Sequence, residues 1–257
     1  MSIETFRHDG GIVEIRLARP PVNALDPELC HSLRNGVDEA IAQGAKGLVI
    51  SGNPKVFSAG LDVPHLLSLG EDRPALSSDW GAFFDAARAL TNSPVPVVAA
   101  ITGHAPAGGC VLALCCDYRV MARSDDPTRP FRIGLNETQV GLVAPAGIQQ
   151  LMERTVGKHR AGVLLATGAL IDAERALDIG LIDELATSDQ TVPRAVAWLQ
   201  SLLKLPSEPV LRTRAISRAD MIAAMSPENI QLDRFIDAWT EPDTQAGLKA
   251  LVARLGK

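Results

Sequence analysis

The sequence lacks the patterns that mark several large classes of protein. Its 257 residues contain no apolar run approaching ~18 residues, so no segment is predicted to cross a membrane. Acidic residues outnumber basic ones by 30 to 25, and the net charge of −5 argues against a nucleic-acid partner and against a broadly basic face for anionic lipid. Residues 1–9 are largely polar and include acids, unlike a secretory or transit peptide. We therefore expect a cytoplasmic protein.

Motifs for metal binding and for two common enzyme classes are also missing. The five histidines show no HxxxH or HxH spacing; they are His8, His31, His65, His104 and His159. The four cysteines lack CxxC spacing, and three of them fall in the apolar run 110–116, which indicates reduced core cysteines. Neither GxSxG nor GxxxxGK[ST] occurs, so serine hydrolases and P-loop proteins have no support. We expect neither a metal nor a separate cofactor.

Apolar runs separated by loops predict alternating strands and helices. The strands are expected at 12–17, 47–51, 96–101 and 118–122, and the helices at 27–43, 79–92 and 108–116. Residues 64–78 are expected to form a loop or a short helix. This alternation is typical of an α/β fold with a parallel sheet that is covered on both faces.

The later part of the chain is predicted to be mostly helical from residue 145, and entirely helical after about residue 190. Segment 228–240 places apolar residues, including Phe235 and Trp239, at roughly helical spacing. This segment could close a site, pack on a neighbouring subunit or take part in ordinary core packing, and the sequence leaves these three interpretations open.

Two glycine-bearing segments follow predicted strands and could each aim a backbone N–H at a ligand. In segment 57–62, Gly60 permits a tight or positive-φ turn that would expose the N–H of Leu61. In segment 106–110, Gly108 and Gly109 allow a ligand to approach the start of a helix, where the N–H of Gly108 would face negative charge. Each segment alone fits an ordinary turn or helix–sheet packing equally well. Together they could form an oxyanion hole.

Glu137 is the carboxylate best placed for proton transfer, because it lies in the largely apolar segment 134–143. An apolar pocket raises the pKa of a carboxylate toward the value that a proton shuttle needs. The plain alternative is a solvent-exposed glutamate at the start of a helix. Asn136 could orient Glu137 or hold a ligand carbonyl through water.

The order of segments 23–25, 57–62, 103–110, 117–119 and 133–141 resembles the enoyl-CoA hydratase/isomerase (crotonase) superfamily over nearly the whole chain. Segments 106–110 and 133–139 most resemble its mitochondrial-type Δ3,Δ2-enoyl-CoA isomerases. The resemblance implies an α/β fold, with a crotonase-like spiral of ββα units that forms two roughly perpendicular sheets. It implies a core at 1–190 that carries the acyl-CoA site and a helical C-terminal region at 191–257 for closure or trimerisation. The implied assembly is a homotrimer or a hexamer.

The resemblance also implies roles for individual residues. The oxyanion donors would be the N–H groups of Leu61 and Gly108, and Ala24 would lie near the adenine of CoA. The path of the pantetheine and thioester would be lined by Ser58, Ala59, Gly60, Leu61 and Asp62. Glu137 matches the second catalytic glutamate of the family. The first glutamate of the hydratases would follow Cys110, where this chain has Val111.

The implied activity is a Δ3,Δ2-enoyl-CoA isomerase of fatty acid β-oxidation, in which one glutamate moves a proton from C2 to C4 of a 3-enoyl-CoA. Coenzyme A would be part of the substrate. The alternatives are another reaction of this superfamily, such as hydration or thioester hydrolysis, or an acyl-CoA-binding protein without turnover. Val111 argues against hydration because a valine cannot activate water. Acyl-chain preference would depend on loop 63–80 and on the late helices.

Overall fold

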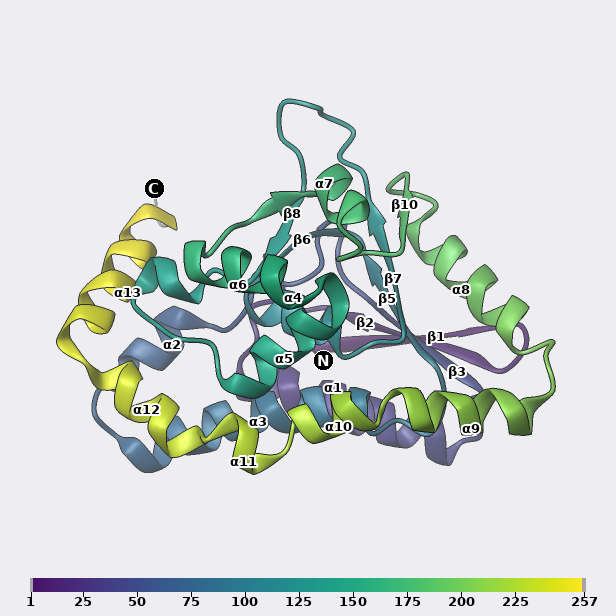
Figure 1. Ribbon diagram of the computed structural model, residues 1–257, viewed down its shortest axis with the longest axis horizontal. Coiled ribbons are helices and arrows are strands. Elements are labelled where there is room, and N and C mark those ends of the chain that lie inside the picture. The colour runs from purple at the N-terminus through teal and green to yellow at the C-terminus, as the bar shows by residue number, and fades with distance from the viewer. Residues whose placement is uncertain (1, 256–257) are drawn as a thin grey trace.

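The computed structural model describes residues 2–255, and it contains two β-sheets surrounded by helices (Figure 1). The larger sheet has six strands in the order β1-β2-β3-β5-β7-β10. Their bounds are Ile3–His8, Ile12–Leu17, Gly47–Ser51, Val97–Ile101, Tyr118–Ala122 and Glu184–Ala186. β1 and β2 are antiparallel, and the other neighbouring pairs in this sheet are parallel. The four strands predicted from the sequence are confirmed.

The sequence pattern does not predict β1, and the exposure of this strand explains why. Its four central side chains are exposed, so no apolar alternation marks it. β1 is joined to β2 by a tight turn at Gly10 and Gly11, which have φ values of 87° and 78°. A Gly-Gly pair before an alternating strand is a hairpin signal, and this signal could have revealed β1.

The smaller sheet brings four distant parts of the chain together. Its order is β4-β6-β8-β9, with bounds Lys55–Val56, Gly103–Pro106, Arg132–Gly134 and Ile171–Asp172. β4, β6 and β8 run parallel to one another. The segments that follow these strands therefore emerge at the same edge of the sheet, and they are the two glycine segments and the segment of Glu137.

Helices cover both sheets between residues 27 and 178. Their bounds are Pro27–Ala42 (α1), Val63–Ser68 (α2), Arg73–Thr91 (α3), Gly108–Leu114 (α4), Glu137–Val140 (the 3-10 helix η1), Ala146–Val156 (α5), Lys158–Thr167 (α6) and Ala173–Asp178 (α7). The prediction of a helix start at 79 is wrong. α3 begins at Arg73 because the carboxylate of Asp72 accepts a hydrogen bond from the Ala75 N–H at 3.1 Å and so caps the helix earlier.

Within the described residues, the regular elements after residue 190 are all helices. Their bounds are Thr191–Leu202 (α8), Ser207–Ser217 (α9), Ala219–Ala224 (α10), Pro227–Ile230 (α11), Leu232–Thr240 (α12) and Pro242–Leu255 (α13). Met1, Gly256 and Lys257, which the predicted regions include, lie outside the described residues. The helix predicted at 228–240 is interrupted at Gln231, whose φ is 48°. No glycine marks this break in the sequence.

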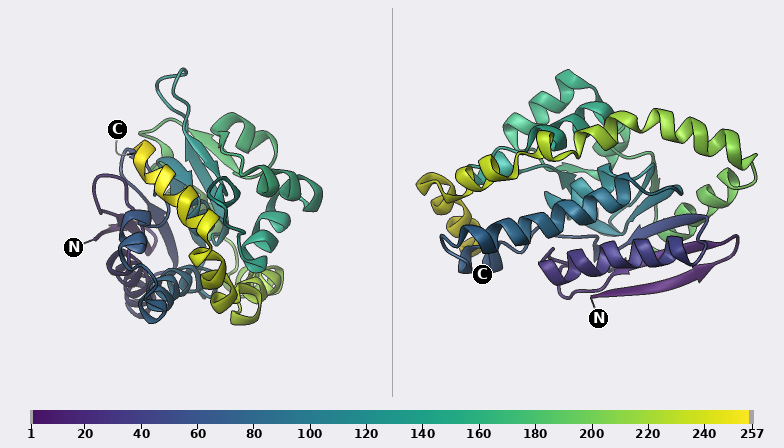
Figure 2. Two further views of the ribbon diagram at one scale, coloured as in Figure 1. Left: turned by 90° about the vertical axis from the view of Figure 1, so that its left-hand side faces the viewer. Right: turned by 90° about the horizontal axis from the view of Figure 1, so that it is seen from below.

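The central strands β2, β3, β5 and β7 of the larger sheet are buried on both faces, as their largely apolar sequences predict. One face packs against α8 through a small cluster that includes Val49, Val98 and Leu199. The other face belongs to the main core, to which α1 and α3 contribute while running side by side (Figure 2, right). α13 lies against η1 and α2 (Figure 2, left). No helix among residues 2–255 is long and apolar enough to span a bilayer.

Candidate active site

The first glycine segment presents a free backbone donor at Leu61. Gly60 has φ 86°, as expected for the predicted turn. The N–H of Leu25 donates to the Gly60 carbonyl at 2.8 Å, and the N–H of Asp62 donates to the Leu25 carbonyl at 3.2 Å. These two bonds flank Leu61 in a parallel bridge, so its own N–H faces away from Leu25. It donates no hydrogen bond within the part of the chain that is described.

The second glycine segment places another donor beside the first segment. Ala107 has φ 47° and ψ −119°, an uncommon conformation for a residue with a side chain, and it directs the chain into α4 at Gly108. The Gly108 N–H begins this helix and has no acceptor among residues 2–255. A Cβ atom added to Gly60 would lie 3.2 Å from the Gly108 nitrogen, so the two segments are in contact.

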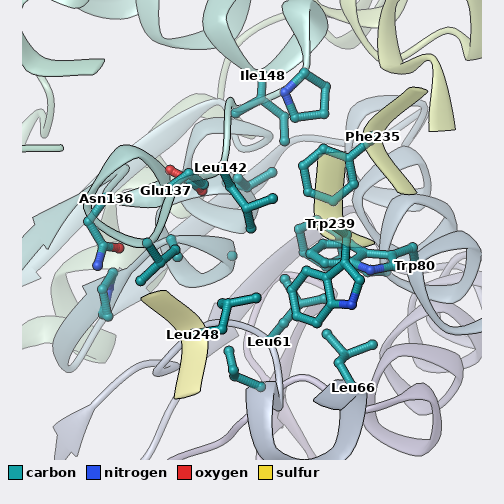
Figure 3. A pocket seen from close by; sticks show the side chains of 18 of the residues that line it. Leu61, Leu66, Trp80, Asn136, Glu137, Leu142, Ile148, Phe235, Trp239 and Leu248 are labelled. Carbon is teal, nitrogen blue, oxygen red and sulfur yellow. The ribbon is translucent and has the colours of Figure 1, made fainter. Parts of the chain in front are cut away.

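Glu137 begins η1 directly after β8, and its carboxyl group extends into a cavity (Figure 3). Its Oε2 atom is buried and has no hydrogen-bond partner in the described residues. Burial raises the pKa of Glu137 from 4.5 to about 7, and a hydrogen bond from its own backbone N–H offsets part of this rise. The expectation of a raised pKa in apolar surroundings is thus confirmed. A carboxyl group that titrates near neutrality can both accept and return a proton.

The cavity has a volume of about 280 Å³, and its lining is mainly apolar. One part of the lining follows strands of the smaller sheet. We call this part the reaction wall, and define it as Leu61, Gly108, Val111, Asn136 and Glu137. The predicted site residues Leu61, Gly108 and Glu137 are therefore brought together around one cavity.

Val111 follows Cys110 directly, at the position where the family resemblance implies a glutamate in the hydratases. It is buried in α4 and lines the cavity, so the reaction wall has one carboxylate instead of two. The neighbouring Cys110 does not supply a nucleophile, because burial raises the pKa of its thiol far above neutrality. Glu137 is thus the ionisable side chain in the lining of this cavity.

The other predicted binding residues divide into two groups. Ala59 and Asn136 line the cavity, but no hydrogen bond joins the Asn136 side chain to Glu137 in the described chain, which leaves the predicted orienting role without support. Ser58 and Gly60 lie behind the lining. The Ser58 hydroxyl is fully buried; it donates to the Asn23 carbonyl at 2.8 Å and accepts from the Gly60 N–H at 3.2 Å. Ser58 therefore shapes the turn.

Ala24 and Asp62 are not part of the cavity lining, and Arg19 links them to each other. The guanidinium of Arg19 donates to the Ala24 carbonyl at 3.1 Å and to a carboxylate oxygen of Asp62 at 2.7 Å. Its Nε lies 2.8 Å from a carboxylate oxygen of Asp26. Asp62 also caps α2 by accepting from the His65 N–H at 3.1 Å. Sequence reasoning assigned no role to Arg19, which fixes the loop next to the first glycine segment.

A second part of the lining, which we call the aromatic wall, consists of Trp80, Phe83, Phe84, Phe235 and Trp239. The sequence analysis placed Phe235 and Trp239 in a segment that could close a site, but it missed Trp80, Phe83 and Phe84. Trp80 packs edge-on against Phe235, with ring centroids 4.6 Å apart, and against Trp239 at 5.5 Å. Figure 3 shows these three rings across the cavity from Glu137. The late helix α12 thus helps to close the cavity, one of the three interpretations left open for segment 228–240. No local motif marks these residues.

No group of three or more histidine, cysteine, aspartate or glutamate side chains within residues 2–255 is arranged to hold a metal ion.

Comparisons with known proteins agree with this geometry. The model of the enoyl-CoA hydratase/isomerase family matches residues 7–254. The chain belongs to this family. Human mitochondrial enoyl-CoA delta isomerase 1 is 30% identical over 250 residues, which cover 95% of this chain and 80% of that protein. A probable enoyl-CoA hydratase of Mycobacterium avium is 31% identical over 225 residues, which cover 84% of each.

A solved structure also matches throughout. The crystal structure of human mitochondrial delta3-delta2-enoyl-CoA isomerase has a TM-score of 0.90 and 28% identity, and the match covers 100% of this chain and 98% of that one. The predicted crotonase fold is therefore confirmed. The family contains both isomerases and hydratases, and the relatives named above include both.

Proposed function

We propose that this family member is a Δ3,Δ2-enoyl-CoA isomerase that shifts the double bond of a 3-enoyl-CoA to the conjugated position. The observation that carries the proposal is the single carboxylate of Glu137, with its buried Oε2 atom, in a cavity that is also lined by Val111 and by two residues with unused N–H donors. A 1,3-proton shift needs one base and a stabilised enolate, and this cavity holds one candidate for each task. The likeness to human enoyl-CoA delta isomerase 1 supports the same reaction.

In the proposed mechanism, the thioester carbonyl oxygen accepts hydrogen bonds from the N–H groups of Leu61 and Gly108. Glu137 removes a proton from C2, and the electrons of that C–H bond enter a dienolate whose negative charge rests on the carbonyl oxygen. The two donors stabilise this charge in a site from which water is excluded. The protonated Glu137 then gives the same proton to C4. The double bond moves from C3–C4 to C2–C3, and no other reactant is consumed.

Hydration of a 2-enoyl-CoA is the alternative reaction within the family, and the likeness to a probable enoyl-CoA hydratase supports it. Adding water requires activation and positioning of that water, and Val111 offers no polar group for this. Thioester hydrolysis could use Glu137 alone as its base, so the assay below also measures the release of CoA. An acyl-CoA-binding protein without turnover would have no use for a desolvated carboxylate whose pKa is about 7.

The test is to offer the purified protein two substrates under the same conditions and to follow three readouts. With trans-3-enoyl-CoA we expect a rapid rise in the absorbance of the conjugated thioester. With trans-2-enoyl-CoA we expect loss of that absorbance by hydration to be at least about 100-fold slower, on the scale of a missing acid–base group. A thiol reagent should detect no release of CoA. Faster hydration, or CoA release, would replace the isomerase proposal by the corresponding reaction.

We further propose that Ala24, together with the loop that Arg19 fixes, receives the adenine end of CoA, and that Ser58 to Asp62 form the path of the pantetheine. The Arg19 contacts to Ala24 and Asp62 support this, because they hold the two segments together at the cavity. Fatty acid β-oxidation is the proposed context.

We also propose that the protein forms a homotrimer, or a hexamer of two trimers. The support is the exposed apolar surface of the late helices. α9 has no buried residue, and large side chains are exposed there and next to it: Leu205, Leu211, Ile216 and Ile222. The most exposed of these four side chains is Ile216, at 73%. Light scattering on the purified protein should give three or six times the mass of the chain, and a monomer would contradict this.

A further inference from the structure

The buried polar atoms without a partner concentrate in the cavity. Within the described residues, five buried side-chain N or O atoms make no hydrogen bond. Two are the Nε atoms of Arg119 and Arg218, whose other guanidinium nitrogens are hydrogen-bonded. The remaining three are Glu137 Oε2, Trp80 Nε1 and Trp239 Nε1, and all three residues line the cavity. The proposed reaction uses the first of these atoms and leaves the two indoles unexplained.

Both indoles are buried deeply enough for this to matter. Trp80 is 5% exposed and Trp239 is 1% exposed. An indole Nε1–H is a donor only, and buried tryptophans usually find an acceptor for it. Trp80 has edge contacts with the rings of Phe235 and Trp239, but an N–H over a ring is a weak substitute for a bond to oxygen.

The lining offers these donors no side-chain acceptor nearby. The lining side chains that carry an acceptor oxygen are Asn136 and Glu137. Both lie on the reaction wall, across the cavity from the indoles in Figure 3. The nitrogen of Trp239 is drawn on the side of Leu66, which is another apolar lining residue. Neither indole N–H therefore has an acceptor among the described residues, and a bound molecule could supply one.

We propose that the acyl group selected by this cavity carries a hydrogen-bond-accepting oxygen, as an oxo or hydroxyl group near its distal end, and that the indole N–H groups of Trp239 and Trp80 bind it. This inference deepens the proposed function, because it rests on the cavity receiving the acyl chain of a CoA thioester. The aromatic wall surrounds the hydrocarbon part of the chain, and the two donors select the oxygenated end.

Binding of unreactive ligands tests the proposal separately from turnover. Calorimetry would compare saturated octanoyl-, decanoyl- and dodecanoyl-CoA, each paired with analogues of equal length that carry an oxo or hydroxyl group at the last or the penultimate carbon. For at least one pair, the wild type should bind the oxygenated ligand about 5- to 10-fold more tightly, as one net hydrogen bond gives. Plain chains that bind as tightly as every oxygenated partner would overturn the proposal.

Three variants assign the preference to particular indoles. Trp239→Phe and Trp80→Phe keep an aromatic ring but remove the donor, so the ratio of the affinities for oxygenated and plain chains should fall toward one, whatever the smaller ring does to the binding of plain chains. Trp198→Phe is the matched control, because Trp198 stacks on Tyr118 outside this cavity, and it should keep the preference. A preference that survives in both single variants and in the double variant would overturn the role of the indoles.

The outcomes also separate this inference from the proposed function. Equal binding within every pair, together with fast isomerisation of a plain 3-enoyl-CoA, would remove the inference and leave the isomerase. Preferred binding of an oxygenated chain without any isomerisation would remove the isomerase proposal and leave the inference about the indoles. If no acyl-CoA binds, both fall.

Discussion

The reaction wall and the aromatic wall of the cavity use different parts of the chain for their polar groups. On the reaction wall, two of the three groups assigned to chemistry are backbone N–H donors, at Leu61 and Gly108. On the aromatic wall, the polar groups without a partner are side-chain donors of Trp80 and Trp239. The proposed chemistry therefore depends on backbone geometry, which a side-chain substitution changes only by moving the backbone. Recognition of the acyl chain depends on side chains, and each of these can be replaced separately.

After removal of Glu137 itself, the largest loss is expected from Gly108→Ala on the reaction wall. An added Cβ would lie 2.9 Å from Leu25 Cδ1 and 3.1 Å from Leu61 Cδ1, so the ends of these two side chains must move, and the methyl group would lie beside the donor in the lining of the cavity. We expect kcat to fall by about 10²- to 10³-fold, the range found when one oxyanion donor is lost. The measurement is the isomerase assay.

Gly162→Ala provides the control, because a Cβ at this exposed helical position would meet nothing within 4 Å. It should leave kcat unchanged. A Gly108→Ala protein as active as this control would contradict the expectation that a methyl group at this position crowds the oxyanion site.

The next largest effect is on pH dependence, and it concerns the reaction wall alone. With the pKa of Glu137 raised to about 7, kcat/KM for a 3-enoyl-CoA should be about tenfold lower at pH 6 than on a plateau above pH 8, since only the carboxylate removes a proton. A rate that does not change over this range would contradict the raised pKa.

The same pKa shift affects stability. The folded chain holds the Glu137 proton more tightly than the unfolded chain, so this stabilisation is complete below about pH 4.5 and is lost as the pH rises through about 7. The Glu137→Gln variant has no proton to lose at this position, so its stability does not fall over this pH range for this reason. In denaturant titrations, the stability of the variant relative to wild type should rise by on the order of 3 kcal/mol between about pH 4.5 and about pH 8.

On the aromatic wall, Phe235→Leu should change recognition more than chemistry. Phe235 packs edge-on against Trp80, and the smaller side chain widens the cavity there. We expect KM to rise about fivefold for acyl chains long enough to reach α12, while kcat stays within about twofold, because a contact far from the reacting carbons contributes equally to ground state and transition state.

Phe131→Leu serves as the comparison, since Phe131 is equally buried but packs against His104 outside the cavity lining. It should leave both parameters unchanged. A fall in kcat with unchanged KM in Phe235→Leu would place this residue in the chemistry and break the distinction between the walls.

The smallest effect is expected at Arg19, which supports the reaction wall from behind. Arg19→Met removes the ion pairs to Asp26 and Asp62 and loosens the loop beside Gly60. Partly exposed ion pairs contribute modestly, so a two- to fivefold rise in KM is expected, of the order of 1 kcal/mol. Arg123→Met, which removes an exposed pair with Glu174, is the control and should change nothing measurable.

The same comparison explains how much the sequence could reveal. The donors of the reaction wall belong to short segments in which a glycine and the exposed N–H are neighbours, so Leu61, Gly108 and Glu137 could be selected before the fold was known. The aromatic wall joins α3 and α12, which are far apart in the chain, and nothing local in either segment marks Trp80 or Trp239 as partners. Their meeting is a property of tertiary packing.

The errors in the predicted helices and strands, by contrast, have local causes. The hairpin strand β1 was hidden by its exposed side chains, and the early start of α3 by a cap at Asp72 that precedes a polar turn of the helix. The helix is broken at Gln231 by a positive φ, a conformation that a glutamine in the sequence does not predict. By contrast, the strands of the buried parallel sheet were apparent because their residues are uniformly apolar.

If the carboxylate of Glu137 carries out the isomerisation, the wild-type protein and Glu137→Gln must differ sharply on trans-3-enoyl-CoA. We expect a rapid rise in conjugated thioester absorbance for the wild type and a kcat about 10³-fold or more lower for the variant, while both proteins bind a saturated acyl-CoA with similar affinity. A Glu137→Gln protein that isomerises at the full wild-type rate would contradict it.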